Sequence, residues 1–147
     1  MDTEEATYFI DRIDAGEQLA DVLAHYAQED CVIFALPHDG MTIGRVVAER
    51  LHAPVVPLDV KGDELIDSLA GKTVILVDDG LNTGKTMHAA VEKIAPYSPT
   101  KIIIAVPVAE YDALRPLRQK VNDIVALNIP QEFAGAIDDY YREPVER

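Results

Sequence analysis

The sequence predicts an α/β fold, a three-layer α/β/α arrangement around a mostly parallel five-stranded sheet. Short apolar runs rich in valine and isoleucine recur along the chain, and segments with helical spacing of apolar residues separate them. Strands that alternate with helices in this way pair in parallel through right-handed crossovers. The length of 147 residues indicates a single domain over residues 1–147.

The apolar runs place the five strands at 31–36, 55–60, 74–77, 101–108 and 124–128. Pro57 lacks an amide donor, so the second strand is expected at an edge of the sheet. A first helix is predicted with Asp14 as its N-cap and Glu17 completing a capping box. Further helices are predicted at 41–51, 62–70, from 84 onward, and at 111–121, where Pro116 fits poorly.

Charge and composition exclude several classes of function. A net charge of -13 argues against nucleic-acid binding, which needs a basic surface. No apolar run approaches the roughly 18 residues of a membrane span, and the acidic start lacks the layout of a signal peptide, so we expect a cytoplasmic protein without a membrane partner. The single cysteine, Cys31, allows no internal disulfide and no cysteine metal site.

The stretch from Val74 to Thr86 is the segment around which the chain is organised. A buried strand runs into Asp78 and Asp79, after which Gly80 is expected to supply backbone freedom. A loop with two glycines and two threonines then opens a helix. With Thr83 as the predicted N-cap, free amides and the helix dipole favour an anion such as phosphate. The nucleotide-binding pattern G-x-x-x-x-G-K-[ST] is missed by one position.

This stretch resembles the ribose-5-phosphate-binding signature of type I phosphoribosyltransferases, which has four apolar residues, two acids and a loop ending in T-G-x-T. The resemblance implies that Asp78 and Asp79 hold the ribose and act in catalysis, with an indirect role in holding Mg²⁺. It implies binding of phosphoribosyl pyrophosphate or a nucleoside monophosphate. The remaining ribose-phosphate ligands would be Gly80, Leu81, Asn82, Thr83, Gly84, Lys85 and Thr86.

A second pattern extends the resemblance. Residues 36–44 are similar to L-P-R-G-G-x-x-x-G of a bacterial subgroup of predicted phosphoribosyltransferases, and Phe9-x-Asp11-Arg12-x-x-Ala15-Gly16 matches the opening of that subgroup. In the family such a loop approaches pyrophosphate, which implies this role for His38, Asp39 and Gly40, with Lys61 as a basic contact. His38 and Asp39 stand where arginine and glycine are usual.

The resemblance implies Mg²⁺-dependent transfer of a phosphoribosyl group to a nitrogenous acceptor such as a nucleobase. The long mobile lid of type I enzymes is short or absent between Val60 and Val74. A non-catalytic module that senses nucleotides or phosphoribosyl pyrophosphate is therefore the alternative. Phe133, Tyr140 and Tyr141 either stack on a base or cover an edge of the core. A homodimer is compatible with the sequence, which does not define the oligomeric state.

Overall fold

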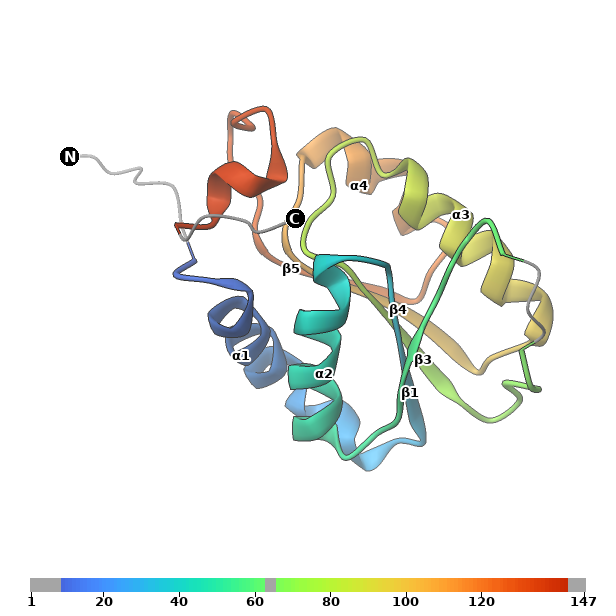
Figure 1. The fold of residues 1–147 in the computed structure, drawn as a ribbon. Helices are drawn as coiled ribbons and strands as arrows, with labels where there is room; N and C mark the ends of the chain where they lie inside the picture. The colour runs from blue at the N-terminus through green and yellow to red at the C-terminus, as the bar shows by residue number, and fades with distance from the viewer. Residues whose placement is uncertain (1–8, 63–65, 143–147) are drawn as a thin grey trace.

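The computed structural model describes residues 9–62 and 66–142 and shows an all-parallel sheet in the order β2-β1-β3-β4-β5 (Figure 1). The predicted three-layer fold is confirmed. The strands are β1 (Cys31–Ala35), β2 (Val55–Pro57), β3 (Thr73–Val77), β4 (Lys101–Val108) and β5 (Asp123–Asn128). The helices are α1 (Arg12–Leu23), α2 (Asp39–Leu51), α3 (Lys85–Ile94) and α4 (Tyr111–Arg118), with short 3₁₀ helices η1 (Ala24–Gln28), η2 (Ala95–Tyr97) and η3 (Ile137–Tyr140).

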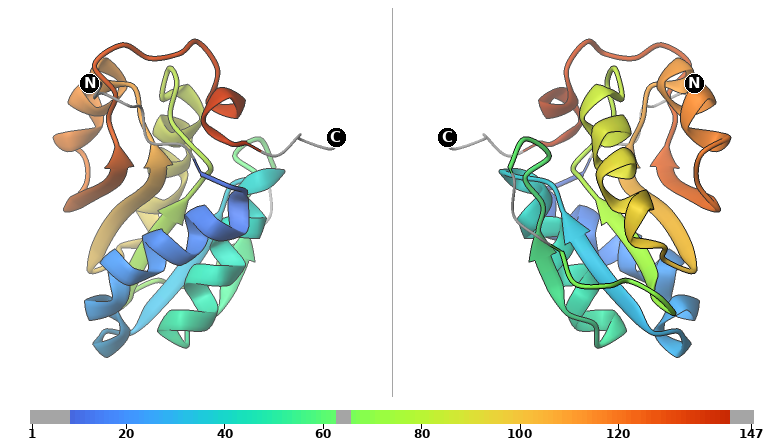
Figure 2. Two further views of the ribbon diagram at one scale, coloured as in Figure 1. Left: turned by 90° about the vertical axis from the view of Figure 1, so that its left-hand side faces the viewer. Right: turned by 90° about the vertical axis from the view of Figure 1, so that its right-hand side faces the viewer.

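Each face of the sheet has its own apolar core, because successive side chains of a strand point to opposite faces. Ile33, Ile75 and Ile103 pack with α1 and α2 on one face. Phe34 and Leu76 belong to the core on the other face, beneath α3 and α4. The two pairs of helices are seen on opposite sides of the strands in Figure 2. β1, β3 and most of β4 are buried on both faces, which accounts for their uninterrupted apolar sequences.

Helix α1 begins earlier than the sequence predicted. Asp11 is the N-cap, and its carboxylate accepts from the Asp14 amide at 2.7 Å. The Asp14 carboxylate in turn accepts from the amide of Ile10 at 3.0 Å. The prediction of Asp14 as N-cap was wrong because Asp14 lies in the first turn of the helix, where its side chain accepts from the amide of Ile10, which precedes the helix. This reciprocal arrangement fixes Arg12 as the first helical residue.

Other elements differ from the predictions at their ends. β2 stops at Pro57 rather than at residue 60, and it lies at the sheet edge as Pro57 predicted. The helix predicted at 62–70 is wrong where it can be checked, since Gly62 and residues 66–70 form no helix; residues 63–65 lie outside the described part. There, burial of Leu58 and Leu69 holds the chain to the core without a helix. α4 ends at Arg118 and contains Pro116.

Among residues 9–62 and 66–142, no helix combines the length and apolar character needed to cross a bilayer.

The strand order has one reversal. From β1 the chain moves outward to β2, and it then returns past β1 to β3, β4 and β5. The carboxyl ends of β1 and β3 are therefore neighbours from which the connections diverge in opposite directions. In open parallel sheets ligands bind in the crevice at such a point.

Helix α2 approaches the sheet closely at Gly44. A Cβ atom at this position would lie 2.8 Å from Ala35 Cβ on β1. In an open helix, replacing glycine by alanine stabilises by about 0.5–1 kcal/mol. Here we expect Gly44→Ala to lower the free energy of unfolding by roughly 1–2 kcal/mol, because overpacking outweighs helix propensity. Urea denaturation measures it, with Glu49→Ala on the exposed side of α2 as control. A stabilised Gly44→Ala variant would contradict the close approach.

Candidate active site at the carboxyl ends of β1 and β3

A cavity of about 240 Å³ opens at the reversal point of the sheet. It brings together the loop after β1, the start of α2, the acid pair after β3 and the first turn of α3. Its lining comprises Leu36, Pro37, His38, Asp39, Asp78, Asp79 and Thr86. Five of the predicted site residues thus line one cavity, namely His38, Asp39, Asp78, Asp79 and Thr86, whereas Gly40 and residues 80–85 do not line it.

Asp78 lies at the back of this cavity. Its Oδ1 accepts from the amide of Asp79 at 2.8 Å. Gly40, in the first turn of α2, packs directly against it, since a Cβ atom there would be 3.2 Å from Asp78 Oδ1. Burial, followed by the nearby charge of Asp79, raises the pKa of Asp78 to about 8. The site therefore favours the protonated acid until a cation or hydrogen-bond donor arrives.

The loop before α3 presents unused backbone donors. Thr83 Oγ1 accepts from the Lys85 amide at 3.2 Å, as predicted for its hydroxyl, although the N-cap position itself belongs to Gly84. Within residues 9–62 and 66–142, the amides of Asn82, Thr83, Gly84 and Thr86 have no hydrogen-bond partner. Gly84 has φ of 82°, a conformation that favours glycine. These amides, at the positive end of α3, suit an anion.

Gly80 has a different role from the one expected. We anticipated that it would supply backbone freedom after the acid pair, but its φ is not positive. A Cβ atom at Gly80 would lie 2.8 Å from Ile137 Cγ2 and 3.0 Å from Val108 Cγ1. Glycine is required here because η3 of the carboxyl-terminal segment packs against the backbone of the acid pair.

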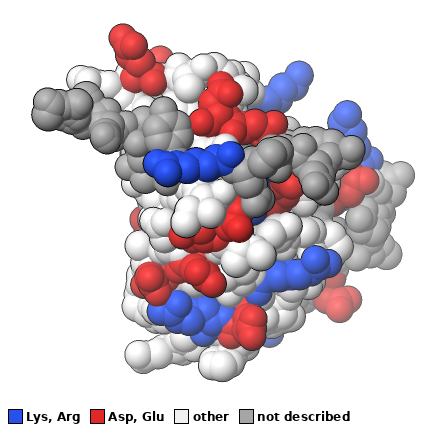
Figure 3. All heavy atoms as spheres, turned by 60° about the vertical axis from the view of Figure 1, so that its left-hand side comes forward, with Lys and Arg blue, Asp and Glu red and all other residues white. Residues whose placement is uncertain are grey.

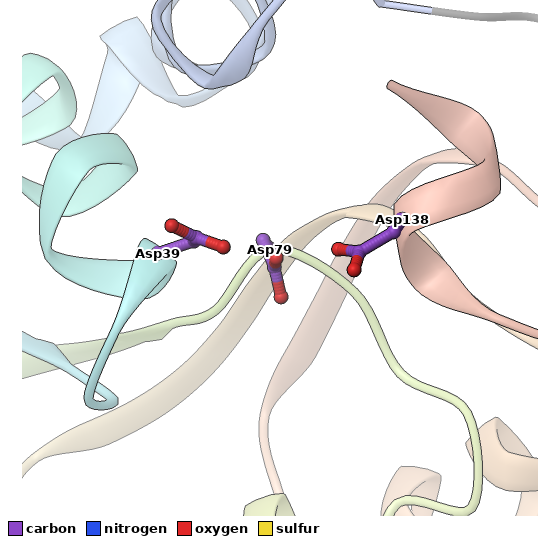
Figure 4. Close-up of side chains that lie close together, drawn as sticks. All are labelled: Asp39, Asp79 and Asp138. Atoms are coloured by element: carbon purple, nitrogen blue, oxygen red, sulfur yellow. The ribbon is translucent and has the colours of Figure 1, made fainter. Parts of the chain in front are cut away.

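The arginine at the start of α1 enters this site and was not predicted to do so. The Arg12 side chain is only 5% exposed, and its Nη2 lies 2.8 Å from Asp79 Oδ2 and 2.7 Å from Asp138 Oδ1. Asp39 Oδ2 is 3.5 Å away. Figure 4 shows the three aspartates converging from α2, the loop after β3 and η3. Lysine and arginine side chains lie among many acidic ones on the face shown in Figure 3.

Tyr141 completes the surroundings of this arginine. The guanidinium carbon lies 3.6 Å from the centroid of the Tyr141 ring, and the Tyr141 hydroxyl donates to the backbone oxygen of Asp79 at 2.9 Å. Burial alone would lower the pKa of Arg12, but hydrogen bonds to Asp79 and Asp138 outweigh it and raise the pKa. Burial raises the pKa of Asp79, against the opposing effect of Arg12. Arg12 is thus a permanent cation between the acids.

The oxygens of Asp39, Asp79 and Asp138 lie within 4.8 Å of one another, a spacing that could hold a metal ion. The Arg12 Nη2 atom is already within 3.5 Å of all three. The charge of this triad is therefore partly balanced by a guanidinium. A divalent cation at the site would have to use the carboxylates that face the cavity, which are Asp39, Asp78 and Asp79.

Comparison with known proteins identifies the family. The family model of the phosphoribosyl transferase domain matches residues 10–143. This chain is a member of that family. The all-parallel sheet is thus that of a phosphoribosyl transferase domain.

Individual relatives agree with this assignment. The crystal structure of TT1426 from Thermus thermophilus is 26% identical, with a TM-score of 0.84 over 95% of this chain and 93% of that one. The purine phosphoribosyltransferase of Pyrococcus horikoshii Ot3, 22% identical with a TM-score of 0.63 over 92% of each chain, shares the fold. A ribose-phosphate pyrophosphokinase of Bacillus caldolyticus is 28% identical over 84% of this chain, which spans only 44% of that curated relative.

Two predicted pyrophosphate contacts of this phosphoribosyl transferase domain differ in their placement. His38 lines the cavity with φ of 69° and ψ of -122°, a conformation that costs a non-glycine residue about 1–3 kcal/mol. Such strain is found at ligand-binding loops. Lys61 is exposed and does not line the cavity. Its turn is held to α3, where Lys93 Nζ donates to the carbonyl oxygens of Asp59 and Gly62.

The aromatic residues of the tail cover the core. Tyr140 and Tyr141 are 1% and 5% exposed, so the suggestion that they stack on a base is wrong for these two. Tyr141 packs on Phe9 with ring centroids 5.5 Å apart, and the two residues also form a parallel bridge through their backbones. Phe133 remains half-buried, 5.4 Å from the Tyr140 ring.

The raised pKa of Asp78 predicts a pH-dependent stability. In the unfolded chain an aspartate ionises near pH 4, whereas folded Asp78 holds its proton to about pH 8. Between these values the folded state binds more protons, so the free energy of unfolding should fall as pH rises. Asp78→Asn should remove this decline. The free energy of unfolding of the variant, taken relative to that of wild type, should therefore be higher at about pH 7.5 than at about pH 5. Urea denaturation at both values measures it, and parallel pH profiles would contradict it.

Proposed function

We propose that this chain is a phosphoribosyltransferase that binds phosphoribosyl pyrophosphate and transfers its phosphoribosyl group to a nitrogenous acceptor such as a nucleobase. One observation carries the proposal. The acid pair Asp78–Asp79 lines the cavity at the reversal point of the sheet, and the loop of unpaired amides leads into Thr86, which lines the same cavity. A sugar phosphate is a ligand that uses both, because its phosphate oxygens accept hydrogen bonds from amides and its hydroxyls donate hydrogen bonds to carboxylates.

The two carboxylates can serve the ribose together. Asp78 faces the cavity from the end of β3, and the contact of Asp79 Oδ2 with Arg12 leaves its Oδ1 able to accept from a hydroxyl. The loop residues 82–86 would hold the 5-phosphate through their amides and the Thr83 and Thr86 hydroxyls. Gly84 allows the backbone to turn toward the phosphate without side-chain interference.

The donor set of the cavity suits Mg²⁺. Carboxylate oxygens are the protein ligands that Mg²⁺ takes, usually one or two together with substrate phosphates, and Asp39, Asp78 and Asp79 supply them here. When bound, Mg²⁺ would neutralise the pyrophosphate. The loop that would border the pyrophosphate contains His38, Asp39 and Gly40. Because the Asp39 carboxylate would repel pyrophosphate, this loop needs a cation such as Mg²⁺ to bind it.

The same residues favour the transition state. As pyrophosphate leaves the anomeric carbon, the ribose ring develops the positive charge of an oxocarbenium ion. Carboxylates fixed beside the ribose stabilise that charge more than they stabilise the neutral ground state. The phosphate loop contributes by holding the sugar in position. Lys61, exposed on its turn, is a candidate contact only if the 59–62 turn moves toward the cavity.

The alternative function is a regulatory module that senses nucleotides or phosphoribosyl pyrophosphate with little turnover. The observation that favours it is the position of His38 and Asp39 at the cavity, where the resembling subgroup has arginine and glycine. Binding of ribose 5-phosphate fits both functions. Turnover assays with Mg²⁺, phosphoribosyl pyrophosphate and a panel of bases separate them, because only the transferase releases pyrophosphate in a base-dependent manner.

The acid pair provides the direct test of ligand class. We expect Asp78→Asn and Asp79→Asn each to weaken ribose 5-phosphate binding by roughly 1.5–3 kcal/mol, the contribution of hydrogen bonds to charged groups. Inorganic phosphate should bind equally well or better, since Asp79→Asn removes a negative charge and Asp78, protonated in the absence of a ligand, contributes none. Isothermal titration measures both ligands, and Asp139→Asn, an exposed acid of the nearby tail, is the matched control. Unchanged ribose 5-phosphate affinity in both variants would overturn the assignment.

A further inference from the structure

We propose that Arg12 is the positioning residue for ribose recognition, holding the Asp79 carboxylate in place from behind the cavity. This inference rests on the proposed function, in which the Asp79 carboxylate binds the hydroxyls of the ribose. Arg12 is 5% exposed and is not part of the cavity lining, whereas Asp79 both lines the cavity and accepts from Arg12 at 2.8 Å. Arg12 therefore acts through Asp79 and does not touch the ligand.

The arginine is itself held before any ligand binds. Its backbone is the first residue of α1, fixed by the reciprocal bonds between Asp11, Asp14 and Ile10. Its guanidinium lies over the Tyr141 ring at 3.6 Å. The ends of the described chain are joined at the same place, where the Phe9 amide donates to Tyr140 O and the Arg142 amide to Phe9 O, both at 2.8 Å.

The contacts of the guanidinium account for the choice of arginine. Nη2 donates to Asp79 and Asp138, and it lies 3.5 Å from Asp39. Nε is buried and has no hydrogen-bond partner among residues 9–62 and 66–142. One nitrogen at the end of a rigid planar group thus holds the acid after β3 and the acid of η3 in one geometry, while the ring of Tyr141 supports its face. A lysine ammonium on its flexible stem would lack this planar support.

A positioned carboxylate binds ribose more strongly than a mobile one, because the cost of ordering it is met during folding. Loss of Arg12 would release Asp79 to turn toward water and would leave the acids repelling one another. The effect should fall on ribose hydroxyls. It should spare the phosphate loop, since residues 82–86 make no contact with Arg12 within the described part of the chain.

The test is a double-mutant cycle read with two ligands. Arg12→Gln should weaken ribose 5-phosphate binding about tenfold and leave inorganic phosphate binding within about twofold. In the Asp79→Asn background, Arg12→Gln should lower the affinity for ribose 5-phosphate by no more than about a further twofold, because the carboxylate that Arg12 positions is gone. Arg12→Lys should restore only part of the affinity. Arg50→Gln, which removes an exposed arginine paired with Asp21, is the matched control.

An equal loss in both backgrounds, or an equal loss of phosphate affinity, would show a merely structural role and overturn the inference. If Arg12→Gln does not fold, the same cycle with Arg12→Lys decides. Crystal structures of unliganded wild type and Arg12→Gln give a readout that needs no ligand, since positioning by the guanidinium requires the Asp79 side chain to change its orientation when that group is removed. Should wild type bind phosphate but not ribose 5-phosphate, the proposed function fails, while an unchanged Asp79 orientation would overturn the role of Arg12.

Discussion

The buried guanidinium of Arg12 is the contact on which the geometry of this site depends. Three carboxylate groups lie with their oxygens within 4.8 Å of one another in a protein whose net charge is already -13. Such carboxylates repel strongly in a partly buried place, and each would be driven toward its protonated form. A permanent cation among them offsets part of that repulsion. The acids can then be concentrated where the proposed sugar phosphate and its metal ion would need them.

The strand order decides which residues can share this place. Because the connections diverge after β1 and β3, the loops that follow these two strands border one crevice, although His38 and Asp78 are forty positions apart in the sequence. The pairing also continues past the end of β3, where the Leu81 amide donates to Val108 O and the Glu110 amide to Leu81 O, both at 2.9 Å. This bridge fixes the backbone between the acid pair and residues 82–86.

Much of this arrangement could be predicted from the sequence, because its signals are local. The strands appear as apolar runs, and the acid pair and T-G-x-T loop are adjacent along the chain, so their convergence with residues 38–40 follows from the parallel sheet. Arg12 left no such signal. Its partners Asp79 and Asp138 are 67 and 126 positions away, and no periodicity links them. The pattern containing Asp11 and Arg12 was visible, but its physical role needed the tertiary structure.

The errors have similar causes. Asp11 and Asp14 are both acceptable N-caps by residue type, and only the bonds to Asp14 N and Ile10 N distinguish them. Gly80 resembled a flexible turn residue because a close approach by Ile137, 57 positions later, cannot be read locally. The tail tyrosines have the composition of a base-stacking surface, but the Tyr141 ring packs on Phe9 and Arg12 and its hydroxyl donates to Asp79.

These long-range contacts preorganise the acidic side chains of the site but do not close the cavity over a ligand. Three contacts attach the carboxyl-terminal segment to the acid pair and its neighbours: Ile137 against Gly80, Asp138 with Arg12, and Tyr141 with the Asp79 backbone. A segment fixed in this way adds no ordering cost when a ligand binds, which favours affinity. It also does not line the cavity, so it cannot by itself shield a reacting sugar from water. On the proposed function, ligand binding would therefore depend on Arg12 with its acidic partners and on residues 82–86, whereas transfer would depend on a segment that covers Asp78.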